Sequence, residues 1–294
     1  MRTIVCAGLL LGACCVQAGC PPDGSSRESL LALKVRQWMM DDAQSRERLA
    51  DSLLDCLAHP DPVLRDDLAF EALQHWMRAD QLPTASLQSM RERLLAWLAP
   101  GGIDAAGFRQ PFAALVLAEV ARADRRQPYL SAAQRDDLLR RGATYLAGLN
   151  DYRGFDAREG WRHGVAHGAD LMLQLSLNPQ LDDAQRERIV QAVWSKVAPA
   201  GEHFYRYGEP ERLMAPAFHV ARRAAFDAAR WESWFMALAA SVATPSPQTE
   251  AALARRHNVG AFLQAFYVSV QESGDAGLRE RVLPGLVKAL KALP

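Results

Sequence analysis

Apolar residues recur at every third or fourth position along most of the chain. Leu30, Leu31, Val35, Trp38 and Met39 follow this spacing, which is typical of a helix with one buried face. The same spacing, with Pro, Gly or Asp at the breaks, predicts further helices over residues 63–79, 84–98, 111–123, 131–149, 159–177, 183–197, 211–222, 226–243, 248–257, 260–273 and 277–293. No run alternates β-branched and polar residues, so strands are not expected.

Short turns separate these helices. In His59-Pro60-Asp61-Pro62, for example, Asp61 is expected to cap a helix whose first residue is Pro62. Helices of this length with short connections favour an all-α fold, a HEAT-like stack of antiparallel helix pairs that forms an irregular α-solenoid. No strict sequence repeat is present, so an irregular helical bundle is the alternative. Composition does not change at the loop 150–158, and residues 27–294 are therefore expected to form a single all-helical domain.

The first residues differ from the rest of the chain. Arg2 is the only charged residue among the first twenty, the following positions are apolar or small, and Val16-Gln17-Ala18 fits the small-x-small pattern of a signal peptidase site. The apolar run is shorter than the roughly 20 residues that a membrane span needs. Residues 1–18 are therefore expected to be an export signal, followed by a tether over residues 19–26.

Four of the five cysteines lie in or beside this signal, and Cys56 alone belongs to the body. Gln17-Ala18-Gly19-Cys20 resembles a lipoprotein signal except at Gln17, so lipidation of Cys20 and plain cleavage after Ala18 are both open. Without lipidation, Cys20 could pair with Cys56 in an oxidising compartment. The favoured interpretation of Cys56 is a small buried apolar residue. The protein is expected in the periplasm or as a cell-envelope lipoprotein, with a lipid anchor as its only contact with the membrane.

Charge excludes one class of partner. The chain has 34 basic and 34 acidic residues, which are interleaved along the sequence, and 49% of its residues are hydrophobic. A protein with no surplus of basic charge is not expected to bind nucleic acid. The apolar content is enough for a substantial core.

The most informative segment is 151–170, which contains two histidines, a tryptophan and several carboxylates and glycines. On a helix at about 100° per residue, His163, His167, Asp170 and Gln174 fall within an arc of about 60°. We call these four residues the polar stripe. The other directions of this helix are apolar, which predicts a buried helix with a polar cavity at the stripe. Trp161 falls about 160° from His163 and is expected to anchor the helix on its opposite side.

Three interpretations of the polar stripe are open. His163, His167 and Asp170 could bind a divalent metal ion, because residues one turn apart project toward one point. They could instead line a metal-free binding or catalytic pocket, or form a structural network of hydrogen bonds. The sequence lacks the Glu of the H-E-x-x-H protease motif, and no G-x-S-x-G or phosphate-binding glycine motif is present.

Residues outside the stripe are further candidates. Asp151 and Arg153 could pair with the stripe or make a solvated turn. Glu202, His203, Glu209 and Arg212 follow the next helix, and an antiparallel return could bring Glu209, Arg212 or His203 beside the stripe. In a hydrolase, Glu209 or Glu202 would act as a base toward metal-bound water. The alternative is an ordinary polar loop whose Glu caps a helix.

Several short motifs together resemble a known family. They are Leu64-Arg65-Asp66 with Trp76, Tyr145-Leu146, Asp151-x-Arg153-Gly154-Phe155, Gly160-Trp161-x-His163-x3-His167-x-Ala169-Asp170, and Gly208-Glu209 with Arg212-Leu213. The combination is similar to the bacterial family named domain of unknown function 2785. The resemblance implies an all-helical body and a shared polar site, and it implies no activity. Family members usually carry an acidic residue near the position of Leu149, so the Leu argues against a complete acid/base or metal site.

These observations lead to one functional hypothesis and one alternative. The hypothesis is an exported binding or scaffold protein of the cell envelope, with a polar cavity around His163, His167 and Asp170 that takes an unknown protein or small molecule. The alternative is a metal-dependent hydrolase that uses the same three residues as ligands.

Overall fold

The computed structural model describes residues 19–243 and 249–294, and the predicted export signal over residues 1–18 lies outside the described residues. Within the described ranges the chain forms twelve α-helices: α1 (Arg27–Val35), α2 (Ala43–Leu53), α3 (Glu71–Arg78), α4 (Thr84–Leu98), α5 (Arg109–Arg126), α6 (Ala132–Gly148), α7 (Gly164–Ser176), α8 (Asp183–Val197), α9 (Glu209–Arg223), α10 (Ala228–Ala243), α11 (Glu250–Glu272) and α12 (Ala276–Lys291). Three further helical segments are the 3-10 helices η1 (Leu54–Ala58) and η3 (Pro100–Gly102) and the π-helix η2 (Val63–Phe70). The all-α prediction is confirmed.

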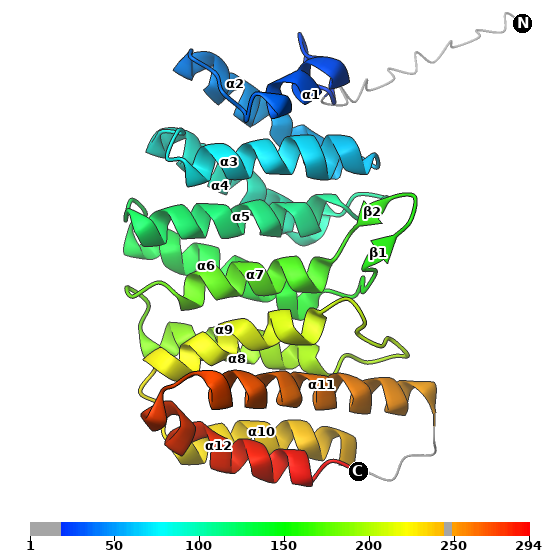
Figure 1. Cartoon of the computed structure of the whole chain (residues 1–294), viewed down its shortest axis with the longest axis vertical. Helices are drawn as coiled ribbons and strands as arrows, with labels where there is room; N and C mark the ends of the chain where they lie inside the picture. The colour runs from blue at the N-terminus through cyan, green and yellow to red at the C-terminus, as the bar shows by residue number, and fades with distance from the viewer. Residues whose placement is uncertain (1–18, 244–248) are drawn as a thin grey trace, which may run out of the picture.

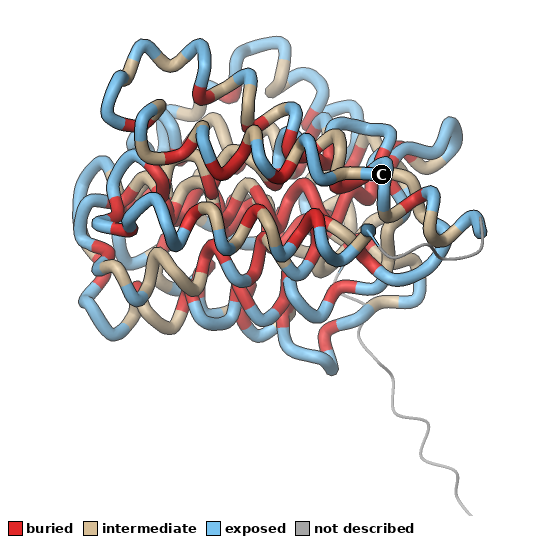
Figure 2. Tube along the Cα trace, turned by 90° about the horizontal axis from the view of Figure 1, so that it is seen from below, coloured by how far each residue is buried: buried red, intermediate tan, exposed pale blue. Residues whose placement is uncertain are grey.

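The helices lie in two layers along the long axis of the molecule (Figure 1). Helices α5, α7, α9 and α11 pack side by side in one layer, and α4, α6 and α8 pack in the other. Buried residues gather between the layers, and exposed residues follow the outer faces (Figure 2). One apolar cluster extends from Leu30 to Ala289. The HEAT-like assignment itself stays a prediction.

Local capping signals explain where several helices begin. The Ser131 hydroxyl accepts the N–H of Gln134, whose side chain accepts the N–H of Ser131 in return. Asp61 accepts the N–H of Val63, in line with its expected capping role. Thr84 is the first residue of α4, and the start of that helix has no side-chain cap.

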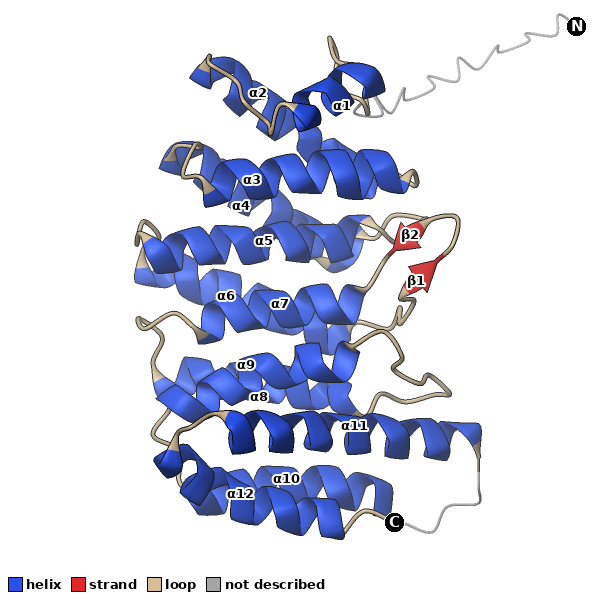
Figure 3. Ribbon diagram, viewed as in Figure 1, coloured by secondary structure: helices blue, strands red, loops and turns tan. Residues whose placement is uncertain are grey.

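Two helix boundaries differ from the predicted ones. The helix expected over residues 159–177 begins only at Gly164, because Phe155–Asp156 (β1) and Gly160–Trp161 (β2) form a small antiparallel hairpin (Figure 3). The helices expected over 248–257 and 260–273 are one helix, α11. Asn258 does not break it, since its side chain accepts the N–H of Tyr205 and donates to the carbonyl of His203.

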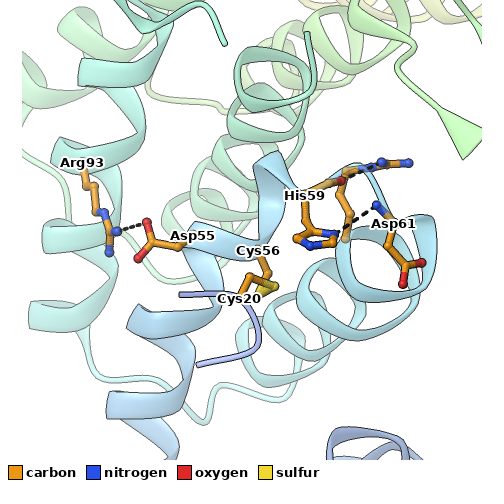
Figure 4. Close-up of a disulfide and its surroundings, with 7 residues drawn as sticks. Cys20, Asp55, Cys56, His59, Asp61 and Arg93 are labelled. Carbon is orange, nitrogen blue, oxygen red and sulfur yellow. Dashed lines mark hydrogen bonds and ion pairs between the residues drawn. A yellow bond between two sulfur atoms is a disulfide. The ribbon is translucent and has the colours of Figure 1, made fainter. Parts of the chain in front are cut away.

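A disulfide joins Cys20 to Cys56 of η1 across 36 residues of sequence (Figure 4). Cys56 is fully buried, but it is bonded to Cys20, so the favoured interpretation of Cys56 as a buried apolar residue in place of a disulfide partner is wrong. A sulfur in a disulfide cannot carry a thioether-linked lipid, so the disulfide and lipidation of Cys20 exclude each other. Within the described residues, no helix is long and apolar enough to cross a membrane.

Candidate functional site

The backbone at His163 determines the geometry of the whole segment. The N–H groups of Arg162 and His163 donate to the carbonyls of Gly154 and Arg153 and thereby continue the hairpin up to the start of α7. His163 then takes a left-handed conformation, with φ 52° and ψ 38°, directly before Gly164. A non-glycine residue adopts this conformation at a cost and mainly where surrounding contacts hold it. His163 is therefore not on the helix, and its ring does not follow the helical wheel.

The ring of His163 points to α9, where its Nε2 lies 3.6 Å from Oε1 of Glu209. Both residues are buried, and Glu209 is only 2% exposed. The other carboxylate oxygen of Glu209 accepts the N–H of Tyr207 at 2.8 Å. Burial raises the pKa of Glu209, but the nearby ring of His163 and the hydrogen bond from the backbone of Tyr207 outweigh burial, so the pKa lies below its usual value. Glu209 is thus an ionised side chain that connects two loops.

Trp161 covers the same histidine. The two rings stack at a centroid distance of 4.7 Å and an interplanar angle of 23°. The prediction that Trp161 anchors the opposite side of the helix is wrong, because both residues precede α7: Trp161 lies in β2, and His163 has a left-handed backbone. Tyr207 meets Trp161 edge to face at 5.7 Å, so the hairpin and the loop before α9 share one aromatic cluster.

His167 lies deeper, on the first turns of α7. It is 6% exposed, its ring meets the edge of Phe112 at 5.2 Å, and its Nδ1 has no hydrogen-bond partner among the described residues. Burial, together with the nearby His163 and Arg212, lowers the pKa of His167 to about 3. The imidazole is therefore neutral at physiological pH.

The other two residues of the polar stripe, Asp170 and Gln174, accept hydrogen bonds from arginines of neighbouring helices. Arg212 of α9 donates to Asp170 at 2.7 Å, and Arg125 of α5 donates to Gln174 at 3.3 Å. Burial raises the pKa of Asp170 to about 6, although Arg212 opposes this shift. Helix α8 returns antiparallel to α7, and α9 then runs parallel to α7, which brings Glu209 and Arg212 beside the stripe (Figure 1). His203 does not lie beside the stripe; it stacks on Tyr152.

The geometry does not support the metal prediction. Within residues 19–243 and 249–294, no group of three or more His, Cys, Asp or Glu side chains is placed so that it could hold a metal ion. His163 is turned toward Glu209, and Asp170 is engaged by Arg212. The convergence of His163, His167 and Asp170 depended on His163 being helical, and the left-handed backbone removes that condition.

A cavity lined by charged and aromatic residues lies beside the stripe and not around it. It has a volume of about 690 Å³ and opens between the hairpin segment and the loop before α9. We call it the hairpin cavity, and its lining consists of Asn150, Asp151, Tyr152, Arg153, Gly154, Phe155, Asp156, Glu159, Arg162, His203, Arg206 and Tyr207. Asp151 and Arg153 line it as an ion pair with each other, with 2.9 Å between Arg153 Nε and Asp151 Oδ1. The alternative of a buried pair with the stripe is therefore not observed.

The two loops meet through close contacts. The ring of Tyr207 lies so near Gly154 that an added Cβ would come within 2.1 Å of it. His203 stacks on Tyr152 at 5.3 Å and 24°, and burial lowers the pKa of His203. Glu202 is exposed and is not among the lining residues. Sequence reasoning missed Tyr152 and Arg206 as site residues, and the density of aromatic residues in 152–155 and 203–207 was the available signal.

Comparison with known proteins gives a family match over this site. Residues 103–268 match the family model described as protein of unknown function (DUF2785). The matched range includes the hairpin cavity, the polar stripe and Glu209, and it leaves out the disulfide. No curated protein and no solved structure matches the chain.

Proposed function

Because the chain belongs to the DUF2785 family, whose description names no activity, we propose its function from the geometry alone. The protein is an exported binding protein of the cell envelope, and its ligand is a small hydroxyl-rich molecule without net charge, such as a saccharide. The observation that carries the proposal is the hairpin cavity, in which aromatic rings stand among balanced charges.

The size of the cavity suits a small ligand. Its volume of about 690 Å³ lies within the range of about 300 to 1,000 Å³ that is usual for ligand sites. A site of this kind combines apolar and aromatic walls with a few polar groups that fix orientation. The hairpin cavity has both, and it is open to solvent at the rim formed by Phe155 and Tyr207, which are 47% and 36% exposed.

Charge argues for a ligand without net charge. Three arginines and three carboxylates line the cavity and balance one another, namely Arg153, Arg162, Arg206, Asp151, Asp156 and Glu159. Arg153 pairs with Asp151, and Arg162 pairs with Glu159 at 2.8 Å. Arginines that are already paired attract a phosphate less strongly, while the guanidinium N–H groups can still donate to hydroxyl groups and the carboxylate oxygens can still accept from them.

The aromatic rings supply the apolar contact. Tyr152, Phe155 and Tyr207 present flat faces or edges at the cavity, and the apolar C–H face of a sugar ring can pack on such a surface. Large aromatic side chains bury apolar area with little loss of side-chain entropy, which is why they are common at recognition sites.

Two features of the chain support export. The sequence over residues 1–18 has the pattern of a secretion signal. The disulfide between Cys20 and Cys56 fits a protein that folds in an oxidising compartment such as the periplasm.

The proposal is tested by thermal denaturation of the purified mature protein with a panel of ligands at 10 mM concentration: neutral mono-, di- and trisaccharides, zwitterionic amino acids and sugar phosphates. A neutral saccharide should raise the melting temperature, since a ligand that binds only the folded state stabilises it. Tyr207→Ala should abolish that increase. The matched control is Tyr267→Ala on α11, which removes a tyrosine that does not line the cavity. Stabilisation by sugar phosphates alone would contradict a ligand without net charge, and no response to any saccharide would overturn the proposal.

A further inference from the structure

A second cavity lies on the other side of Asn150 and Asp151, which line both cavities. It has a volume of about 490 Å³ and lies among the end of α4, the start of α5 and the end of α6. We call it the Tyr145 cavity. Its surface is mainly apolar and is contributed by residues such as Leu98, Ile103 and Leu149. The polar stripe does not reach it, so its chemistry differs from that of the hairpin cavity.

One polar group in this cavity lacks a partner. Tyr145 is 6% exposed, and its hydroxyl makes no hydrogen bond among the described residues. The oxygen lies over the start of α7, where an added Cβ on Gly164 would come within 3.2 Å of it. Burial raises the pKa of Tyr145, with the charge of Asp151 as a lesser cause, so the group stays a neutral phenol that can donate. Buried hydroxyl groups nearly always have a partner, and Tyr145 is one of the residues that line this cavity.

The charges at this cavity restrict the partner. Asp104 and Asp151 are its charged lining residues, and no lysine or arginine lines it. Asp104 accepts the N–H groups of Gly107 and Arg109, and Asp151 pairs with Arg153. A carboxylate or phosphate ligand would therefore be repelled by two acidic side chains, and no lysine or arginine of the lining would offset that repulsion. A neutral molecule faces no such repulsion.

We propose that the Tyr145 cavity is a second binding site, which takes a neutral apolar molecule with one carbonyl or ether oxygen and holds that oxygen by a hydrogen bond from the Tyr145 hydroxyl. Leu98, Ile103 and Leu149 contact the apolar part of the molecule. The site is separate from the saccharide site and does not depend on it.

The test uses prodan, a neutral fluorescent naphthalene with a single ketone oxygen, and the full mature protein. Prodan should bind saturably, with the blue-shifted emission of an apolar environment. Tyr145→Phe keeps the ring and removes the donor, so the dissociation constant should rise about three- to tenfold, as expected for one hydrogen bond. Gly148→Leu should abolish binding, because Gly148 lines the cavity and an added side chain there meets open space.

The melting temperature of each variant distinguishes a loss of prodan binding from a loss of folding. Since the Tyr145 hydroxyl has no partner in the protein, Tyr145→Phe should leave the melting temperature unchanged or raise it, while binding weakens. Tyr129→Phe and Gly277→Leu are matched controls outside the cavity and should bind prodan like the wild type. Tyr207→Ala should also leave prodan binding intact, which distinguishes this site from the hairpin cavity. The proposal would be overturned if the wild type did not bind prodan saturably, or if Tyr145→Phe and Gly148→Leu both bound prodan as tightly as the wild type does.

Discussion

Nε2 of His163 lies 3.6 Å from Oε1 of Glu209, and this contact joins the end of the hairpin segment to the first turn of α9. Glu209 also accepts a hydrogen bond from the backbone N–H of Tyr207, and His163 stacks on Trp161. Since Tyr207 lines the hairpin cavity, the pair fixes the distance between the two loops that form it. His163 and Glu209 are therefore positioning residues for the cavity.

Removal of this carboxylate should loosen both loops. Glu209→Ala is expected to lower the free energy of unfolding by about 1 to 3 kcal/mol, because His163 and the N–H of Tyr207 lose a buried partner. Urea denaturation measures this change. Glu211→Ala, two residues along the same helix and exposed, is the matched control and should have little effect. Equal stabilities of the two variants would show that the contact does not hold the loops.

Acidification should destabilise the protein through His167. Burial lowers its pKa to about 3, whereas the unfolded chain takes up this proton at about pH 6.5. The stability that His167 contributes is thus present above pH 6.5 and is lost as the pH falls toward 3. Between pH 7 and pH 5 the loss from this group is about 2 kcal/mol. Urea denaturation at the two pH values should show a smaller difference for His167→Gln than for the wild type.

Acidification should stabilise the protein through Asp170, which is opposite to its effect through His167. Burial raises its pKa to about 6 from 3.8, so the folded protein binds this proton more tightly than the unfolded chain. Its contribution is fully present below about pH 4 and is lost as the pH rises through 6. Asp170→Asn cannot titrate, and its stability should therefore fall more steeply than that of the wild type between pH 6 and pH 4. If Asp170→Asn and His167→Gln change the pH profile in the same direction, the assignment of the two groups is wrong.

Gly154 should tolerate no side chain. An added Cβ would come within 2.1 Å of the Tyr207 ring, so Gly154→Ala must displace that ring and one wall of the hairpin cavity. We expect a loss of about 1 to 3 kcal/mol in the free energy of unfolding, which is usual for overpacking. In the double variant with Tyr207→Ala the cost of the alanine should nearly disappear, and a double-mutant cycle measures this coupling. Additive effects would contradict the contact.

The disulfide should stabilise the N-terminal end of the stack. It closes 36 residues of sequence, and reduction is expected to cost about 2 to 4 kcal/mol by the chain-entropy model. Urea denaturation with and without dithiothreitol measures the effect, and Cys56→Ser is the control because it should not respond to the reductant. Intact mass of the protein purified from cells would also reveal whether Cys20 carries lipid in place of the disulfide.

Local sequence signals were sufficient for most helices. Apolar spacing and caps such as Ser131 with Gln134 act over three or four residues, so they can be recognised without the tertiary structure. Asn258 and Gly260 gave a misleading signal, because a break was expected there and the side chain of Asn258 instead bonds to a distant loop. The sequence also indicated Glu209 and Arg212 as neighbours of the stripe, since the turns before and after α8 bring the start of α9 back to the start of α7.

The sequence by itself determined the helical class, the neutral charge balance and the segment in which the site lies, because these follow from composition and short-range periodicity. Only the tertiary structure decided what the site is. One left-handed residue, His163, turns its ring from the helix toward Glu209, and the packing of α7 against α9 brings the loops 150–159 and 203–207 around a common cavity. Contacts between residues this far apart in the chain depend on how whole helices pack, and a pattern read over a few turns carries no information about them.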